Sequence, residues 1–367
     1  MVNTGRLRML GVVGAVLLAG LLITPASTVL AQVRYEVTGL GTLGGSSPSS
    51  EAMDINNAGQ IVGFTTTPSG TRAFRYTNGT MQNLGTLGGA SWAFGISSDG
   101  RVAGCSSMAG GIDRGFLYSG TTMTNLGTLT GSGGSYAYDI NDAGQVVGGA
   151  TSASGTGHAF RYSGGTKTDL GTLPGGDSSE AHGINNLGQI VGSSYTAAGP
   201  QHAFLYSGGQ MTDLGTLGGM ESSAWRINDA GQIIGRSYTS TGREHAFLYT
   251  AGAMIDLGTF GGTRSDALGI NSAGQVVGNA WLQNDSSVRA FLYDQGSLIN
   301  LNTLIDPSSG WTLFYANAIN DNGLIVGRGI NPQGYNEAFL LTPVPEPATI
   351  GLLGIGLAAL VARRRRR

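Results

Sequence analysis

The segment from Ala181 to Gly215 reads AHGINNLGQIVGSSYTAAGPQHAFLYSGGQMTDLG and holds one complete structural unit. It divides into four short runs rich in Ile, Val, Phe, Tyr and Thr, residues that favour a pleated, half-buried strand. Asn185-Asn186-Leu187-Gly188 and Ser207-Gly208-Gly209 separate these runs, and glycine supplies the positive φ that closes a tight hairpin turn. The segment therefore predicts four antiparallel strands.

The same unit recurs along most of the chain. A Leu-Gly-Thr-Leu-like element begins every 42 to 44 residues, at Leu40, Leu84, Leu126, Leu170, Leu214, Leu257 and Leu301. An Ala-x-x-Ile-Asn-like element begins at Ala52, Ala93, Ala137, Ala181, Ala224, Ala267 and Ala316. A third element, fullest as His-Ala-Phe-Leu-Tyr at His202 and His245, also occurs seven times. Four strands in a repeat of this length are typical of a β-propeller blade.

The two ends of the repeat region are incomplete in complementary ways. Tyr35 to Gly45 matches only a fourth strand, and Glu337 to Thr342 matches only a third strand. We therefore predict that Tyr35–Thr42 lies beside Ala338–Leu341 and closes a ring, burying two blade faces worth on the order of 10 kcal/mol. The predicted fold is an all-β, seven-bladed propeller over residues 32–342. A β-solenoid and a different blade number are the alternatives, but neither explains the complementary ends.

The three recurring elements together resemble the extracellular HAF-repeat family, named for its His-Ala-Phe element. The resemblance covers roughly residues 35 to 342. It implies export and a repeat architecture, but little biochemistry.

The first 31 residues have the pattern of a secretory signal peptide. Arg6 and Arg8 precede an apolar run from Met9 to Ile23, and Val29-Leu30-Ala31 fits the small-residue cleavage pattern before Gln32. An uncleaved membrane helix is the alternative, which the short apolar run disfavours.

Residues 343–367, here called the sorting tail, have three parts in order. Pro345, Glu346 and Pro347 precede an apolar segment, Ala348 to Ala362, and five arginines follow. These are Arg363, Arg364, Arg365, Arg366 and Arg367. The order resembles the PEP-CTERM sorting signal, which implies cleavage by an exosortase and export to the outer surface or extracellular matrix of a Gram-negative bacterium. We expect a transmembrane helix here that anchors the chain transiently in the inner membrane, its arginines on the cytoplasmic side. A plain anchor without processing is the alternative.

The composition excludes several classes of protein. Glycine accounts for 64 of 367 residues, but 40% of the residues are hydrophobic and the glycines recur at fixed positions, which is unlike collagen or a disordered chain. Lys167 is the only lysine, which argues against a nucleic-acid partner because such partners need clustered cations. The single cysteine, Cys105, excludes an internal disulfide framework.

The residues that could carry chemistry are few. His158, His202 and His245 occupy one equivalent position in three successive repeats, so they should lie too far apart to share a metal ion. Asp54 and Asp139 precede turns, and we interpret them as turn caps rather than calcium ligands. We expect no catalytic residue, no metal and no cofactor.

Aromatic residues cluster in register near the start of the first strand of several repeats. The candidates for a ligand-binding rim at one mouth of the channel are Trp92, Tyr136, Trp225 and Tyr315, with carboxylates nearby. Aromatic faces beside carboxylates suit stacking on sugar rings. Packing between blades is the competing interpretation, and it is favoured because aromatic residues dominate core energetics.

The sequence thus predicts a non-enzymatic surface or matrix protein, either structural or glycan-binding, with exopolysaccharide or another surface protein as partner. The alternative is a propeller enzyme, a polysaccharide lyase or hydrolase acting at the channel mouth. A third hypothesis is a periplasmic scaffold for protein partners.

Overall fold

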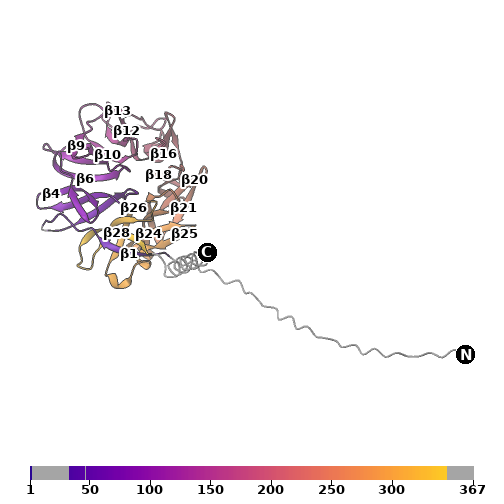
Figure 1. Cartoon of the computed structure of the whole chain (residues 1–367). Helices are drawn as coiled ribbons and strands as arrows, with labels where there is room; N and C mark the ends of the chain where they lie inside the picture. Colours follow the sequence, from indigo (N-terminus) through magenta and orange to yellow (C-terminus); the bar gives the residue numbers. More distant parts are fainter. Residues whose placement is uncertain (2–32, 46, 345–367) are drawn as a thin grey trace. The chain divides into compact units, whose positions relative to one another are not determined.

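The computed structural model of the protein describes Met1 and residues 33–45 and 47–344. The described part of the unit that starts at Val33 consists of blades that follow one another around a central axis (Figure 1). Each blade contains four antiparallel strands. The predicted signal peptide and the predicted transmembrane helix lie outside the described residues.

The first four blades follow the sequence without interruption. Blade 1 contains β2 (Ser50–Ile55), β3 (Ile61–Thr67), β4 (Gly70–Thr77) and β5 (Thr80–Asn83). Blade 2 contains β6 (Gly88–Ile96), β7 (Val102–Met108), β8 (Asp113–Ser119) and β9 (Thr122–Asn125). Blade 3 contains β10 (Ser135–Ile140), β11 (Val146–Thr151), β12 (Gly157–Ser163) and β13 (Thr166–Asp169). Blade 4 contains β14 (Ser179–Ile184), β15 (Ile190–Tyr195), β16 (Gln201–Ser207) and β17 (Gln210–Asp213).

The remaining blades include the closing one. Blade 5 contains β18 (Gly218–Ile227), β19 (Ile233–Thr239), β20 (Glu244–Thr250) and β21 (Ala253–Gly258). Blade 6 contains β22 (Gly261–Ile270), β23 (Val276–Leu282), β24 (Val288–Asp294) and β25 (Ser297–Asn300). Blade 7 contains β26 (Thr312–Ile319), β27 (Ile325–Ile330), β28 (Asn336–Val344) and β1 (Arg34–Gly39). Three short 3-10 helices lie in loops: η1 (Gln283–Asp285), η2 (Leu301–Thr303) and η3 (Pro307–Ser309).

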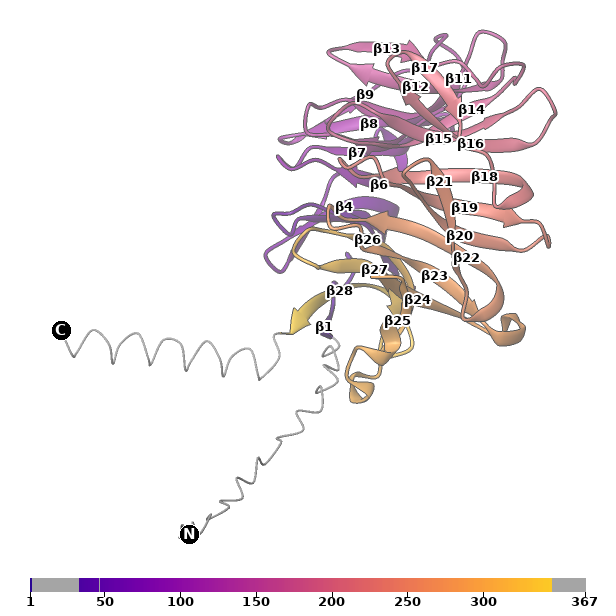
Figure 2. The ribbon, with the colours of Figure 1, turned by 90° about the vertical axis from the view of Figure 1, so that its right-hand side faces the viewer.

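The ring closes as predicted. β1 pairs antiparallel with β28, with Val37 opposite Leu341 and Gly39 opposite Phe339. Figure 2 shows the two strands side by side at the edge of the propeller. The N-terminal strand is therefore the fourth strand of the blade that the C-terminal repeat begins, and the prediction of seven blades is confirmed.

The His-Ala-Phe element builds the core of each blade. Its phenylalanine is fully buried in all seven blades: Phe74, Phe116, Phe160, Phe204, Phe247, Phe291 and Phe339. Clusters of buried residues join neighbouring blades, and in one of them Val147 and Ala159 of blade 3 lie with Phe204 of blade 4. Truncating a buried phenylalanine to alanine typically costs ~3–5 kcal/mol, so these residues dominate the stability of the blade interfaces.

The histidine of the same element has a structural contact. In blade 4, Nδ1 of His202 on the third strand lies 2.8 Å from a carboxylate oxygen of Asp213 on the fourth strand. Equivalent pairs form between His158 and Asp169 and between His245 and Asp256. Each of these histidines thus links the third strand of its own blade to the outermost strand.

A serine near the start of the first strand links most neighbouring blades. Oγ of Ser222 accepts a hydrogen bond from the backbone N–H of Ala203 at 2.8 Å and donates one to the carbonyl of Gly215 at 2.6 Å. Both partners belong to the preceding repeat. The same two contacts recur at Ser50, Ser91, Ser135, Ser179 and Ser265. Two hydrogen bonds per junction add specificity to the apolar packing.

Candidate functional site

The innermost strand of every blade contains a β-bulge at the same place. The pairing of the first two strands shifts by one residue directly after the recurring alanine, which leaves the next residue without a partner on the second strand. The seven bulged residues are Met53, Phe94, Tyr138, His182, Trp225, Leu268 and Asn317. Bulges of this kind re-aim a side chain and recur next to functional sites.

A glycine on the second strand lies opposite every bulge. A Cβ atom there would be 1.8 to 2.1 Å from a backbone carbonyl oxygen of the innermost strand. The seven glycines are Gly63, Gly104, Gly148, Gly192, Gly235, Gly278 and Gly327. Since no side chain fits at that distance, glycine at this position permits the bulge, and the bulge in turn brings a side chain to the channel.

All seven bulged residues line one cavity of about 400 Å³ on the axis of the propeller, together with Glu180 and Arg226. Four of them form an aromatic arc along one side. The ring centroids of Phe94 and Tyr138 are 5.6 Å apart, those of Tyr138 and His182 5.6 Å, and those of His182 and Trp225 4.6 Å. A volume of this size and an apolar wall with a few polar groups are typical of a small-ligand site.

Glu180 connects two members of the aromatic arc. The Tyr138 hydroxyl donates to Oε1 of Glu180 at 2.8 Å, and Nε2 of His182 lies 3.3 Å from Oε2. Although burial opposes the charge on Glu180, its hydrogen bonds with His182 and Tyr138 lower its pKa below the ordinary value. Burial and the nearby Glu180 carboxylate raise the pKa of Tyr138, so its phenol stays protonated. The cavity wall therefore carries a fixed negative charge.

His182 is held from both sides of its ring. Nδ1 lies 2.9 Å from the carbonyl oxygen of Ala224, and because a carbonyl only accepts, this nitrogen carries a hydrogen. Nε2 faces the Glu180 carboxylate, with its Oε2 at 3.3 Å. The two contacts fix the orientation of the imidazole ring in the wall of the cavity.

A layer of charged residues lies in the channel next to the cavity. Nη1 of Arg226 donates to the carbonyl oxygens of His182 at 3.1 Å and Trp225 at 3.2 Å. Burial raises the pKa of Asp54 to about 7, although the Arg226 guanidinium opposes this shift. Burial likewise raises the pKa of Asp139, again against the charge of Arg226.

The two aspartates do not act as the predicted turn caps. Oδ1 of Asp54 accepts from the N–H of Ile55, and Oδ2 accepts from the N–H of Ile96 in the next blade, both at 2.9 Å. Asp139 makes the same two contacts, to Ile140 and to Ile184 of the next blade. The interpretation as caps was wrong because these carboxylates join neighbouring innermost strands, whereas the asparagine at the end of the strand caps the turn.

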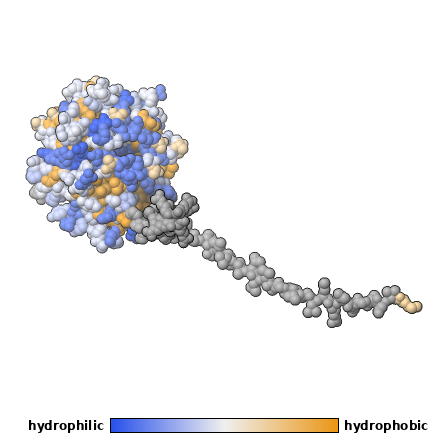
Figure 3. Space-filling model, in the orientation of Figure 1, coloured by the Kyte–Doolittle hydropathy of each residue, from blue (hydrophilic) through white to orange (hydrophobic). Residues whose placement is uncertain are grey.

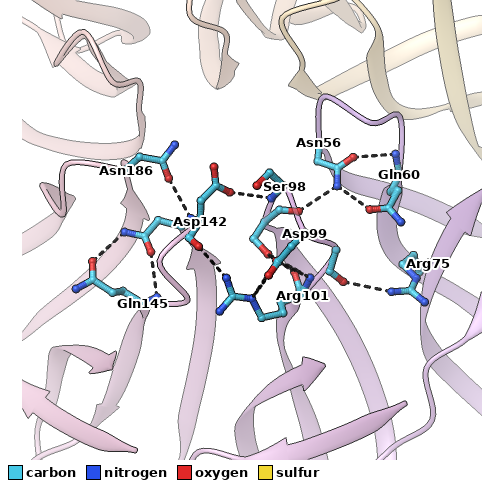
Figure 4. A network of polar contacts seen from close by, with 12 residues as sticks. Asn56, Gln60, Arg75, Ser98, Asp99, Arg101, Asp142, Gln145 and Asn186 are labelled. Atoms are coloured by element: carbon cyan, nitrogen blue, oxygen red, sulfur yellow. Dashed lines mark hydrogen bonds and ion pairs between the residues drawn. The ribbon is translucent and has the colours of Figure 1, made fainter. Parts of the chain in front are cut away.

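The turns between the first and second strands form what we call the turn face of the propeller. They span residues 56–60, 97–101, 141–145, 185–189, 228–232, 271–275 and 320–324, and they surround a second opening of about 250 Å³. Oδ1 of Asn141 caps its own turn by accepting from the N–H of Gln145, while Nδ2 donates to the carbonyl of Asn185 in the next blade. Figure 4 shows this network around Asn56, Asp142 and Asn186.

The bonds between turns continue around most of the ring. Nδ2 of Asn185, Asn228, Asn271 and Asn320 each reaches the next turn, the last one returning to the carbonyl of Asn56 in blade 1. Blade 2 differs, because Ser97 occupies the asparagine position and its hydroxyl donates to Asp99 of its own turn. The turn face thus reinforces the closure made by β1 and β28.

Of the four residues predicted for a ligand-binding rim, Trp225 lines the cavity. Trp92, Tyr136 and Tyr315 lie one position before the recurring alanine and outside the cavity lining. The Tyr136 hydroxyl donates to Asp113 at 2.8 Å, and its ring stacks on Tyr138 with centroids 6.0 Å apart. The guanidinium carbon of Arg328 lies 4.8 Å from the centre of the Tyr315 ring.

The predicted rim residues did not include six of the seven bulged residues that line the cavity: Met53, Phe94, Tyr138, His182, Leu268 and Asn317. These residues share one feature that is visible in the sequence, since each directly follows the recurring alanine of its repeat. The sorting-motif residues Pro345, Glu346 and Pro347 and the arginines 363–367 lie outside the described residues. Within residues 33–45 and 47–344, no three His, Cys, Asp or Glu side chains are grouped in a way that could hold a metal ion.

None of the helices in the described part of the chain is long and apolar enough to cross a membrane.

The surface is mainly a mosaic of hydrophilic patches and smaller hydrophobic ones (Figure 3). The large hydrophobic side chains that are most exposed come from different blades, among them Ile112, Leu187 and Met220. Isolated exposed hydrophobic residues are ordinary on soluble surfaces, so they do not compete with the axial cavity as a binding site.

Comparison with solved structures shows the fold. The β-propeller domain of the trilobed protease from Pyrococcus furiosus, described as having an open velcro topology, is similar over 81% of this chain and 93% of that chain, with a TM-score of 0.55 and 8% identity. A puromycin-hydrolysing peptidase from Mycobacterium tuberculosis is similar over 84% of this chain and 53% of that chain, with a TM-score of 0.50 and 11% identity. At these identities the likeness concerns architecture alone.

No curated protein matches the sequence. The family model of the PEP-CTERM protein-sorting motif matches residues 343–367, the whole sorting tail. This motif implies an exported cell-surface protein that an exosortase processes. The chain is therefore a β-propeller protein that carries a C-terminal PEP-CTERM sorting motif.

Proposed function

We propose that this is a non-enzymatic, HAF-repeat protein of the bacterial surface or extracellular matrix whose axial cavity binds a carbohydrate. One observation carries the proposal: seven equivalent bulges direct one side chain per blade into a single cavity of about 400 Å³. Four of those side chains are aromatic rings in contact with one another. A structural repeat would need no such convergence of unlike side chains at one point.

The cavity wall suits a sugar ring. The apolar C–H faces of a pyranose stack on aromatic rings, and Trp225 and Tyr138 offer such rings on the aromatic arc. Sugar hydroxyls need both acceptors and donors, which Glu180 and Asn317 provide from different sides of the cavity. The seven bulged side chains all differ, which fits an asymmetric ligand such as the end of a glycan chain.

The partner that we propose is exopolysaccharide of the producing bacterium. The sorting tail would first anchor the chain in the inner membrane through the segment Ala348–Ala362. Exosortase cleavage would then release the propeller to the outer surface or matrix. Export on this route would bring the cavity to the compartment in which the proposed polysaccharide is found.

A matched pair of tryptophans tests the binding proposal. We expect Trp225→Ala to reduce retention of the exported protein on purified exopolysaccharide at least about tenfold, which corresponds to ~1.4 kcal/mol of lost stacking energy. Trp92→Ala is the control, since Trp92 lies on an innermost strand but outside the cavity lining. Equal retention of both folded variants and the wild type would leave only a structural or protein-scaffold role.

An enzymatic role has one feature in its favour, the Tyr138–Glu180–His182 network in the cavity. A lyase or hydrolase could use such groups as acid and base. We favour binding because both ring nitrogens of His182 and the Tyr138 hydroxyl already have protein partners. Incubation of the exported protein with exopolysaccharide, followed by size-exclusion chromatography, separates the two: shortened chains lost in Glu180→Gln would establish the enzyme.

A further inference from the structure

The last described strand ends at the turn face. β28 is antiparallel to β27, which is antiparallel to β26, so β28 runs in the same direction as β26. β26 ends at Ile319, directly before the turn 320–324. β28 therefore also ends on this face, where a Cβ built on Gly323 would lie 3.3 Å from Cγ of Pro343.

The axial cavity lies toward the opposite face of the propeller, which we call the cavity face. In each innermost strand the residues that line the cavity precede those at the turn-face opening: in β14, Glu180 and His182 line the cavity and Ile184 lies at the opening. The six residues of β28 that pair with β27, Asn336–Leu341, cover the distance between the two faces, which is ~20 Å for an extended strand. The sorting tail thus starts from the face that is farther from the cavity.

The connection between the propeller and the apolar segment is short. Only Pro345, Glu346 and Pro347 separate Val344 from Ala348. Whatever path they take, the four steps from Val344 to Ala348 span at most ~14 Å. This reach is shorter than the ~20 Å that separates the faces, so the apolar segment begins nearer to the turn face than to the cavity face.

From these distances we infer that, before processing, the propeller is held with its turn face toward the membrane and its cavity face toward the exterior. The inference rests on the proposed anchoring of the sorting tail, but it does not depend on what the cavity binds. The partner of the turn face in this state is a lipid surface. The cavity face therefore points away from the membrane while the chain is still attached.

Two alanines in one blade provide a matched test. Ala143 is exposed in the turn before β11, and Ala153 is exposed in the loop after it, so the six-residue strand separates the two positions by ~20 Å. Ala143→Cys and Ala153→Cys would be made in the full-length chain with Cys105→Ser, since Ser193 occupies the equivalent position of blade 4. Each variant is labelled with a fluorophore and reconstituted into phosphatidylethanolamine–phosphatidylglycerol vesicles that carry an energy acceptor on a fraction of the headgroups in both leaflets.

We expect energy transfer from position 143 to be at least about twofold more efficient than from position 153, because the separation along β11 is ~20 Å. Equal or reversed transfer in chains that float with the vesicles overturns the orientation while leaving the anchoring intact. A full-length chain that does not float with the vesicles overturns the anchoring and the orientation together. Equal thermal midpoints of both variants and the Cys105→Ser parent show that the labels report on the folded propeller.

Discussion

A side-chain carbon on Gly192 would lie 1.9 Å from the carbonyl oxygen of Glu180. This oxygen points at the second strand because the bulge at His182 displaces the backbone of β14. The absence of a Cβ at one position and the direction of a cavity side chain at another are thus two parts of one local structure. The same relationship recurs in each blade with other cavity residues.

Gly192→Ala should therefore damage the bulge rather than the strand as a whole. Inserting a methyl group into such a tight contact typically costs ~1–3 kcal/mol, and relief requires β14 to move and to carry His182 with it. We expect a lower denaturation midpoint together with weaker ligand retention. Gly110→Ala is the control, because a Cβ there meets no atom within 4 Å. Unchanged stability of Gly192→Ala would show that the bulge does not need a glycine.

Asn185→Ala should weaken the junction between blades 4 and 5. The substitution removes the bond from Nδ2 to the carbonyl of Asn228 and the two bonds that Oδ1 accepts within its own turn. Leaving such buried backbone groups without a partner costs ~1–3 kcal/mol, measurable by chemical denaturation. Leu187→Ala in the same turn is the control, since Leu187 is 70% exposed. An equal effect of both changes would argue against the asparagine network.

Asp54 should make the stability of the propeller depend on pH. Burial raises its pKa from 3.8 to about 7, so between these values the folded chain holds a proton that the unfolded chain releases. The stabilisation of the folded chain that Asp54 contributes is therefore fully present below pH 4 and is lost as the pH rises to about 7.

The Asp54→Asn variant has no titratable group at this position. Its denaturation midpoints at pH 4, 5.5 and 7 should therefore fall less steeply with rising pH than those of the wild type. The lost acceptor for the N–H of Ile96 shifts all midpoints alike and leaves the slope unaffected. Some slope should persist, because burial also raises the pKa of Asp139. Parallel curves for the two proteins would disprove the assignment to Asp54.

Replacing Pro345, Glu346 and Pro347 by alanine should block processing of the sorting tail. The family model that matches residues 343–367 implies that an exosortase processes this tail. We expect mass spectrometry to find the arginines 363–367 on the variant in the membrane fraction and a shortened C-terminus on the wild type. Pro68→Ala, in an exposed loop, serves as the control. An intact tail on the wild-type protein would instead support a plain anchor.

The repeat made the architecture predictable, but not the cavity. Seven copies of three elements predicted the blades, and the incomplete units at Tyr35 and Glu337 predicted the closing strand. The bulge was not predicted, because the residue after the recurring alanine is identified as unpaired only by the register with the second strand. Trp92 and Trp225 were therefore both predicted to be rim residues, although the bulge directs only Trp225 to the cavity. Asp54 was misread for a similar reason, since its partner Ile96 belongs to another repeat.

The pairing of β1 with β28 also sets the order of events during folding. The strand that is synthesised first must wait, unpaired, until the last repeat has been made, because its partner is the final strand before the sorting tail. Its exposed edge is available to other chains throughout that interval, so a chaperone that shields extended segments would increase the yield. Any polypeptide whose synthesis stops early lacks the partner altogether. Completion of the ring thus distinguishes finished molecules from truncated ones before the tail is cut.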